Sequence, residues 1–340
     1  MFKETIDCID AGSEFCPCHL AESGECILCS QLQGSHFCDC LNWKGVCIYQ
    51  ELYNNGNKAK EQRKTYTCKV CEKVLCQDDV LLIKFEAPHK LVIDLARPGS
   101  FIFIRSNEDV YFDVPISILE SDIETNIISI MIEIRGVKTK QLLNIEKGGL
   151  ITIRGPYWNG VFGLKNIGKQ KDNDTLVIAR GIGMAPMIPV VQRLVQNGNK
   201  VTVILDKSPF KDIYIMEWLN KLNIVPQEMN LIEKGKLSPE AKVAIKSIVK
   251  YNNISLVHIA GADILTYNII EYLDSLERQD IDLSCCNNFK MCCGEGVCGA
   301  CTARFSGHRV KRFCKVQASP RAISVSYTHL LRRRIYLLNI

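Results

Sequence analysis

A set of four cysteines near the C-terminal end constrains this chain more than any other feature. Their spacing, C-x4-C-x2-C followed by a fourth cysteine, matches the plant-type pattern for a 2Fe–2S cluster. Several glycines lie in the same loop, and glycine reaches the backbone conformations that a loop needs to wrap a cluster. Such a cluster carries single electrons, so the rest of the chain should contain an electron donor. The predicted ligands are Cys293, Cys298, Cys301 and Cys314.

Other uses of these thiols fit the sequence less well. Structural zinc usually takes two C-x2-C-like pairs, and the second pair is missing here. Disulfides would need an oxidising compartment. Cys292 is adjacent to Cys293, and we choose Cys293 because it alone leaves four residues before Cys298.

Composition limits the class of protein. With 340 residues, 47% of them apolar, the chain is long enough for two or three globular domains. The N-terminal residues do not form an apolar signal segment, and no run approaches the ~18 apolar residues of a membrane span. With 18 cysteines, which favour metal ligation in a reducing compartment, these features predict a cytoplasmic protein without membrane contact. The net charge of +5 includes Arg332–Arg334, and no basic stripe for nucleic acid remains.

Hydrophobic patterns predict the main elements. Short β-rich runs bounded by turn residues, without helices between them, predict an antiparallel β-barrel from about residue 65. From about residue 172, strands alternate with helices, which predicts a parallel sheet in a Rossmann-like α/β domain. The barrel runs are 80–86, 100–105 and 126–135. The later strands are 175–179, 201–206 and 256–260, and the helices are 184–196, 213–222 and 263–277.

The fold class predicted is therefore a multidomain protein, with a barrel, a Rossmann-like domain and a small 2Fe–2S module. The segments are a cysteine-rich N-terminal extension (1–64), the barrel (65–168), the α/β domain (169–279), the cluster module (280–324) and a non-native tail (325–340). The charged stretch 54–64 is typical of a linker or solvated connection. We interpret the tail as vector- or adapter-derived translation, with a short helix or strand as the alternative.

A glycine-containing turn in the α/β domain predicts a nucleotide site. Gly181 and Gly183 follow a predicted strand and open a helix, and Pro186 lies in its first turn. Glycines at such a turn let the backbone approach a pyrophosphate, although a tight strand-to-helix turn is the alternative. Asp206 lies 25 residues after Gly181, where an acidic group can bind a ribose hydroxyl and favours NAD. Lys207 and Ser208 could bind a phosphate, so NADP stays open.

Several motifs, taken in order, resemble the electron-transfer subunit of bacterial class 1B dihydroorotate dehydrogenase, in the ferredoxin–NADP reductase-like superfamily. The resemblance covers about residues 65–322. The motifs are Pro-Ile-Ser-Ile from Pro115, Gly-Val-Lys-Thr from Gly136, Gly-Pro-x-x-Asn-Gly from Gly155, Gly-Ile-Gly-x-Ala-Pro from Gly181, and the cluster loop.

The resemblance implies FAD in the barrel, NAD(P) in the α/β domain and a 2Fe–2S cluster that connects the flavin with a partner subunit. Such a subunit serves pyrimidine biosynthesis as part of a hetero-oligomer. It needs no catalytic side chain, because the flavin carries the chemistry. The implied cofactor-binding residues are Pro115, Ile116, Ser117, Val137, Lys138, Thr139, Gly155, Pro156, Gly181, Gly183 and Pro186.

Two departures from the family pattern stand out. The family usually has arginine before Pro-x-Ser, and this chain has Val114, which could weaken or reposition FAD. Many relatives have Cys-Gly near the nicotinamide, where this chain has Ala260 and Gly261.

The N-terminal extension lies outside the family pattern. It holds eight cysteines: Cys8, Cys16, Cys18, Cys26, Cys29, Cys38, Cys40 and Cys47. Such a density, with little apolar sequence to form a core, predicts one or two metal centres, either iron–sulfur or zinc, because ligation can stabilise the fold. The alternative is a reduced, partly ordered extension with exposed thiols. The sequence does not assign the ligands.

These features predict an NAD(P)H-dependent flavin and iron–sulfur oxidoreductase that passes electrons to a partner protein. The expected partner is a dihydroorotate dehydrogenase catalytic subunit, a ferredoxin-like acceptor or a sulfur-reducing protein. The alternative function is a zinc- or redox-sensing regulatory protein without turnover. The physiological acceptor and the direction of electron flow do not follow from the sequence.

Overall fold

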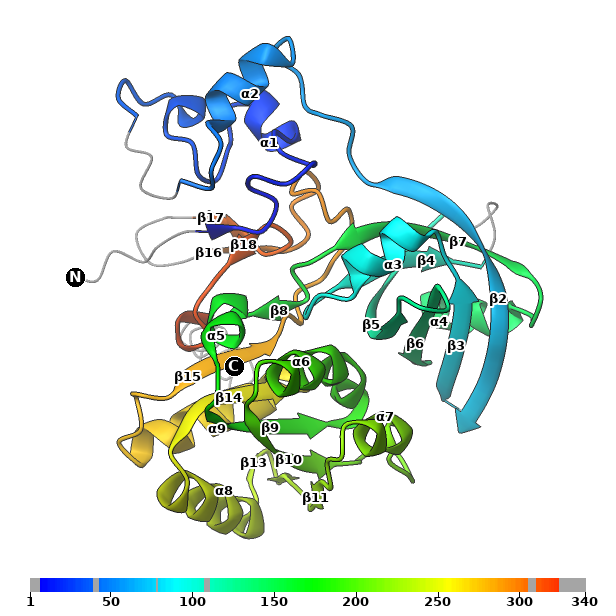
Figure 1. Ribbon diagram of the computed structural model, residues 1–340, viewed down its shortest axis with the longest axis vertical. Helices are drawn as coiled ribbons and strands as arrows, with labels where there is room; N and C mark the ends of the chain where they lie inside the picture. The colour runs from blue at the N-terminus through cyan, green and yellow to red at the C-terminus, as the bar shows by residue number, and fades with distance from the viewer. Residues whose placement is uncertain (1–6, 39–42, 78, 107–110, 305–309, 324–340) are drawn as a thin grey trace, which may run out of the picture. The chain divides into compact units, whose positions relative to one another are not determined.

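The computed structural model describes residues 7–38, 43–77, 79–106, 111–304 and 310–323 (Figure 1). Cys40 and the predicted tail lie outside these residues. The chain forms two compact units. The cysteine-rich unit combines Met1–Thr65 with Phe289–Ala318, and the barrel–sheet unit combines Tyr66–Asn288 with Ser319–Ile340.

A closed antiparallel barrel forms the first half of the barrel–sheet unit, in the strand order β2-β3-β6-β5-β4-β7. Aliphatic side chains from alternating positions fill its core. Its strands are β2 (Lys64–Gln77), β3 (Val80–Glu86), β4 (Phe101–Arg105), β5 (Val114–Asp122), β6 (Ile127–Glu133) and β7 (Leu150–Tyr157). The barrel predicted from the sequence is confirmed.

Helices interrupt the barrel, contrary to the prediction of strands alone. They are α3 (His89–Leu95), α4 (Val137–Lys140) and η2 (Gln141–Asn144). In α3, Leu91, Val92 and Leu95 are buried at helical spacing, and Pro88 precedes the first turn. Periodicity does not predict this helix, because its seven residues are too few to show a repeat.

A six-stranded sheet follows, in the order β11-β10-β9-β14-β15-β8 (Figure 1). The first five strands are parallel, and β8 pairs antiparallel with β15. The strands are β8 (Val161–Phe162), β9 (Asp174–Arg180), β10 (Lys200–Asp206), β11 (Gln227–Glu228), β14 (Ile254–Ala260) and β15 (Asp282–Cys286). This order reverses direction between β9 and β14, as in doubly wound nucleotide-binding folds. The predicted Rossmann-like domain is confirmed.

The connecting elements are α5 (Leu164–Lys169), η3 (Gly181–Gly183), α6 (Met184–Gln196), α7 (Met216–Lys221), α8 (Pro239–Tyr251), α9 (Asp263–Ser275) and the hairpin of β12 (Ile232–Glu233) and β13 (Lys236–Leu237). Helix α6 has the bounds that the sequence predicts. Helix α8 was not predicted, although Ser238 accepts a hydrogen bond from the Ala241 N–H and Pro239 occupies the first turn. Capping serine followed by proline is a helix-start signal.

Two strands pair outside the segments in which the sequence analysis placed them. β15 lies in segment 280–324, predicted as the cluster module, and pairs with β14 in the parallel sheet. β8 lies in segment 65–168, predicted as the barrel, and pairs with β15.

The cysteine-rich unit contains little regular structure. β1 (Asp7–Cys8) pairs with β18 (Val316–Gln317), and β16 (Thr302–Arg304) pairs with β17 (Val310–Arg312). Its helices are α1 (His19–Glu22), η1 (Gln31–Gln33) and α2 (Ile48–Asn54). The sequence analysis describes the stretch 54–64 as a linker or solvated connection. Part of it is buried, because the Arg63 side chain is 1% exposed and ion-paired with Asp10. No helix in the described parts of the chain is both long and apolar enough to cross a membrane.

Candidate functional site

A cavity of about 480 Å³ lies in the barrel–sheet unit, at the carboxyl ends of the parallel strands. Residues directly after β9, β10 and β14, together with the end of β15, line one side of it. They include Gly181, Ser208, Gly261 and Cys286. Open α/β sheets bind ligands at this edge, next to the point where the strand order reverses. The cavity volume is in the range of small-molecule and cofactor sites.

Strands β5 and β6 of the barrel line the other side. Along β5, Val114, Ile116 and Ile118 pack into the barrel core, whereas Pro115 and Ser117 are partly exposed. The alternation of a strand therefore presents Pro115 and Ser117 on the outer face of the barrel. The predicted residues Pro115, Ile116 and Ser117 all line the cavity. Val114, in place of the family arginine, is 6% exposed and belongs to the core.

The loop from β9 into α6 contributes three predicted residues to the same cavity: Gly181, Gly183 and Pro186. Position 183 has no room for a side chain beside the Ala260 backbone. A Cβ atom there would lie 2.5 Å from the carbonyl carbon and oxygen of Ala260. The close approach of this loop to the end of β14 places the N-terminus of α6 at the cavity, where backbone N–H groups favour an anion.

Asp206 does not line the cavity. Its side chain is 2% exposed and accepts hydrogen bonds from the backbone N–H groups of Ser208 and Leu231. It also accepts a hydrogen bond from Arg180 Nε at 2.8 Å. Arg180 does line the cavity. The carboxylate therefore orients an arginine that faces the cavity. Asp206 itself is not placed to bind a ribose in this cavity, so it gives no reason to favour NAD over NADP.

Five more predicted residues lie outside the cavity lining. Val137, Lys138 and Thr139 form the start of α4, where the Thr139 hydroxyl accepts a hydrogen bond from the Arg135 N–H at 2.9 Å. Gly155 and Pro156 lie within β7. The cavity includes instead Arg135, which directly precedes the first of these motifs, and Gly160, the last residue of the second.

Some cavity residues were not predicted from the sequence. They include Arg180 and Cys286, the last residues of β9 and β15, and Asp263 at the start of α9, whereas Ser208 had been considered for a phosphate. Cys286 is notable, because this chain lacks the Cys-Gly pair of many relatives yet places a thiol at the end of the neighbouring strand. Burial raises the pKa of Cys286 to about 12, so the thiol is neutral at physiological pH. The β-rich run that ends at Cys286 could have predicted a strand of the sheet, but it lies in the segment predicted as the cluster module.

The four predicted cluster ligands come together in the cysteine-rich unit. Cys314 forms side-chain hydrogen bonds with Cys293 and Cys301, and Cys293 forms one with Cys298. The bond from the Cys314 thiol lowers the pKa of Cys293 and that of Cys301. Cys292 is exposed. The Phe289 and Phe313 rings stack 4.1 Å apart and join the two ends of the loop.

Backbone N–H groups point at these sulfur atoms. The Glu295 N–H donates to Cys293 Sγ, and the Cys314 N–H donates to Cys301 Sγ, both at 3.3 Å. Hydrogen bonds to sulfur stabilise thiolates and tune the potential of a cluster. Gly296 lets the loop close tightly, since a Cβ atom there would lie 2.7 Å from Leu20 Cδ1. Among the described residues, no group of three or more His, Cys, Asp or Glu side chains is arranged so that it could hold a metal ion.

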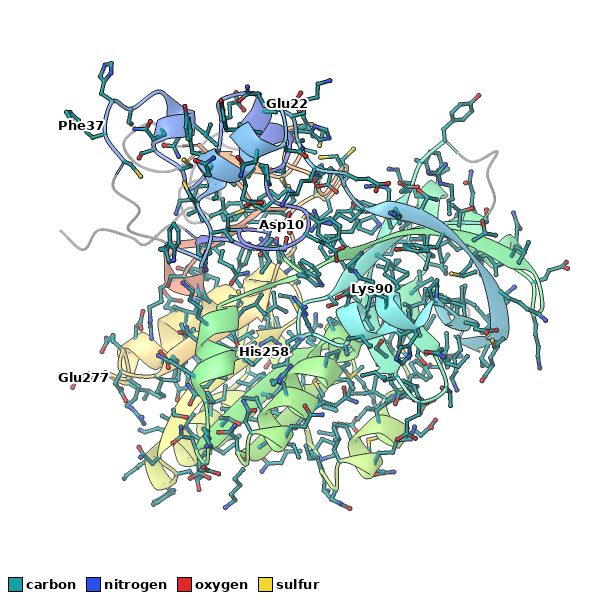
Figure 2. All side chains as sticks on the ribbon, turned by 45° about the horizontal axis from the view of Figure 1, so that its top comes forward. Asp10, Glu22, Phe37, Lys90, His258 and Glu277 are labelled. Atoms are coloured by element: carbon teal, nitrogen blue, oxygen red, sulfur yellow. The ribbon has the colours of Figure 1, made fainter. Side chains whose placement is uncertain are left out.

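A buried ion network connects the C-terminal cysteine loop with the N-terminal one; Figure 2 labels its Asp10. Lys315 Nζ donates to Asp10 and to Glu295, and Arg63 donates to the same two carboxylates. The Lys315 side chain is 0% exposed and the Arg63 side chain is 1% exposed. Two cations and two anions thus neutralise one another away from water, as buried charges must.

Comparisons with known proteins agree with this geometry. No family profile matches the chain. A probable dihydroorotate dehydrogenase B (NAD(+)) electron transfer subunit from Archaeoglobus fulgidus is 24% identical over 206 residues, 60% of this chain and 78% of the relative. The electron transfer subunit of Streptococcus pneumoniae is 25% identical over 234 residues, 68% of this chain and 88% of the relative.

Among solved structures, the NADH-dependent reduced ferredoxin–NADP oxidoreductase is similar to this chain. The TM-score is 0.59 at 20% identity, over 74% of this chain and 86% of that one. This likeness concerns the fold, namely a closed barrel joined to an α/β sheet.

Proposed function

We propose that this chain, a relative of the electron transfer subunits of dihydroorotate dehydrogenase B, passes electrons between NADH and a partner protein through FAD and a 2Fe–2S cluster. One observation carries the proposal. A single cavity joins the outer face of β5 to the glycine loop after β9, so a flavin on the barrel and a nucleotide on the sheet would share one space.

The residues on the barrel side suit FAD. Pro115 and Ser117 present a rigid apolar ring and a hydroxyl from the same strand face, and Gly160 is a further lining residue. Arg135 lines the cavity as well and can offset phosphate charge. We assign FAD binding to these four residues. Bound FAD supplies the conversion of one hydride into two single-electron transfers.

The sheet side suits the nicotinamide nucleotide. Gly181 and Gly183 bring backbone N–H groups to the cavity, and Arg180, held by Asp206, adds a cation. We take NADH as the donor, because the relatives are named as subunits of an NAD(+)-dependent enzyme. The neutral Cys286 thiol lies on the same side and can pack against the nucleotide without changing the charge of the site.

The C-terminal cysteines suit a 2Fe–2S cluster. Each iron takes two thiolates, so four sulfurs that contact one another in pairs match the requirement. The N–H groups of Glu295 and Cys314 would offset the negative charge of the bound thiolates. We assign Cys293, Cys298, Cys301 and Cys314 as the ligands.

We propose a dihydroorotate dehydrogenase catalytic subunit or a ferredoxin-like protein as the partner. The relatives are named as subunits, which supports a hetero-oligomer. The proteins in these comparisons are oxidoreductases by name, so they do not support the zinc- or redox-sensing alternative.

The test uses the full chain, purified without oxygen and reconstituted with FAD, iron and sulfide. We expect flavin absorbance near one equivalent, a 2Fe–2S spectrum, and bleaching of both on addition of NADH. NADPH in a parallel sample decides the nucleotide. A chain that binds neither flavin nor iron, or that binds both and is not reduced by either nucleotide, contradicts the proposal.

A further inference from the structure

Four N-terminal cysteines line one small cavity in the cysteine-rich unit. Its wall contains Cys8, Cys16, Cys18 and Cys26, and the other side chains that line it are mostly apolar. Cys18 is central, because it lies close enough to Cys8, Cys16 and Cys26 to interact electrostatically with each. The four thiols come from a stretch of 19 residues that has almost no core of its own, and they gather without a disulfide. Thiol ligation of a metal centre can supply the stability that so small a core lacks.

Backbone N–H groups donate hydrogen bonds to these sulfur atoms, as they do to those of the C-terminal cysteines. The Cys29 N–H donates to Cys26 Sγ at 3.4 Å. Backbone N–H groups of Gly12 and Asp10 are directed at Cys16 and Cys8. Position 12 has no room for a side chain, because a Cβ atom there would lie 2.9 Å from the Lys44 carbonyl oxygen. In both cysteine loops, backbone N–H groups therefore donate to sulfur, as they do around the ligands of iron–sulfur clusters.

The N-terminal set lies next to the proposed 2Fe–2S ligands. Cys8 pairs with Val316 across β1 and β18, and the Ile9 N–H donates to the Lys315 carbonyl at 2.8 Å. Since Val316 is two residues from Cys314, the Cα atoms of Cys8 and Cys314 lie within about 12 Å of each other. The Asp10–Arg63–Glu295–Lys315 network holds the two loops together at this point.

We propose that Cys8, Cys16, Cys18 and Cys26 hold a second iron–sulfur cluster, adjacent to the Cys293–Cys314 set, as a further carrier of single electrons. This inference rests on the proposed function, which supplies the electrons. Each transfer converts one ferrous iron of the first cluster to ferric and one ferric iron of the second to ferrous, and two such transfers account for one NADH. A zinc ion could bind the same thiolates, but zinc does not accept electrons. Its closeness to the first cluster would then have no role in electron transfer.

The decisive measurement is made on the full chain, anaerobically purified and reconstituted with iron and sulfide. A single 2Fe–2S cluster accounts for about two iron atoms per chain. We expect iron and acid-labile sulfide clearly above this value. In the dithionite-reduced protein, electron paramagnetic resonance should show two signals with magnetic coupling, because the two clusters are close neighbours.

The variant Cys18→Ser should reduce iron to about two atoms per chain and leave one uncoupled 2Fe–2S signal. Cys71→Ser is the matched control, because Cys71 lies on β2 in the barrel–sheet unit and should change neither readout. The wild-type iron content decides the question even if Cys18→Ser fails to fold.

Two results would overturn the inference while the proposed function stands. One is a flavin-containing chain that NADH reduces and that holds only about two iron atoms and one uncoupled signal. The other is stoichiometric zinc that Cys18→Ser removes. Failure of NADH to reduce a chain with both iron signals would instead contradict the proposed function.

Discussion

His258 shows how burial controls a single titratable group. It lies fully buried on β14 (Figure 2), and its Nδ1 is 2.9 Å from the Ser284 hydroxyl. Its Nε2 has no hydrogen-bond partner among the described residues. Burial lowers the pKa of His258 to about 3, so the ring is neutral in the folded protein.

The pH dependence of stability follows from this pKa. The unfolded chain takes up a proton at His258 near its ordinary pKa of 6.5, whereas the folded chain does not until about 3. The stabilising contribution is therefore complete above pH 6.5 and is lost as the pH falls toward 3. Lowering the pH from 8 to 5 should cost about 2 kcal/mol at this residue.

Urea unfolding at pH 5, 6.5 and 8 tests this prediction. His258→Leu should reduce the loss of unfolding free energy between pH 8 and pH 5 by about 2 kcal/mol relative to wild type. If the free energy of unfolding changed equally with pH in wild type and in His258→Leu, the buried ring would not be the cause of the pH dependence.

Arg180 is the second residue whose role depends on a neighbour. It lines the cavity while Asp206 holds its Nε. Arg180→Gln should raise the KM for NADH about tenfold with little change in kcat, because a charge-assisted hydrogen bond contributes about 1.5–3 kcal/mol. Asp206→Asn should raise KM less, since the arginine stays but is less firmly oriented. Stopped-flow reduction of the flavin measures both. An unchanged KM in Arg180→Gln would exclude contact with the nucleotide.

At the scale of elements, the junction of β9, η3 and α6 depends on one close contact. Gly183 approaches the end of β14 so closely that a Cβ atom would lie 2.6 Å from the Gly261 nitrogen. Gly183→Ala should destabilise the barrel–sheet unit by about 1–3 kcal/mol and weaken NADH binding, because backbone atoms must move to admit the methyl group.

Gly168→Ala is the matched control for this junction. Gly168 lies in α5, and a Cβ atom there would meet nothing within 4 Å. Alanine should therefore stabilise the chain by up to about 1 kcal/mol, because glycine is a poor helix former. Thermal unfolding and NADH titration compare the two variants. If both behaved alike, the close approach to β14 would not matter.

At the scale of the whole molecule, the cysteine-rich unit joins the two ends of the described chain. Its ion network takes Asp10 and Arg63 from the first 65 residues and Glu295 and Lys315 from the last 50 or so. Removing one partner of such a network leaves a buried charge without compensation. The unit is therefore built from two segments that are far apart in the sequence.

Lys315→Met should destabilise this unit by about 3–5 kcal/mol, since it leaves Asp10 and Glu295 short of a cation. We expect loss of iron and faster proteolysis near the N-terminal end, with flavin binding retained. Lys60→Met is the control in the same unit, because the Lys60–Glu51 pair is about one-third exposed and contributes at most about 1 kcal/mol. Retention of iron in Lys315→Met would show that the network is dispensable.

Features that depend on short-range order could be predicted from the sequence alone. Helix α6 and strand β3 have the predicted bounds, because apolar periodicity and flanking turn residues act within a few positions. The same local patterns predict three parts of the candidate sites: the glycine loop after β9, the Pro115–Ser117 stretch of β5 and the set of C-terminal cysteines. They do not predict short or weakly patterned elements such as α3.

Which side chains meet could not be predicted before the fold was known. Strand order brings Cys286 and Arg180 to one cavity, and it turns Asp206 inward onto Arg180, although sequence spacing alone placed that carboxylate at a ribose. Asp10 and Lys315 form an ion pair across 305 positions. Such contacts arise from chain topology and from the requirement that buried charges be paired, and no local pattern encodes either.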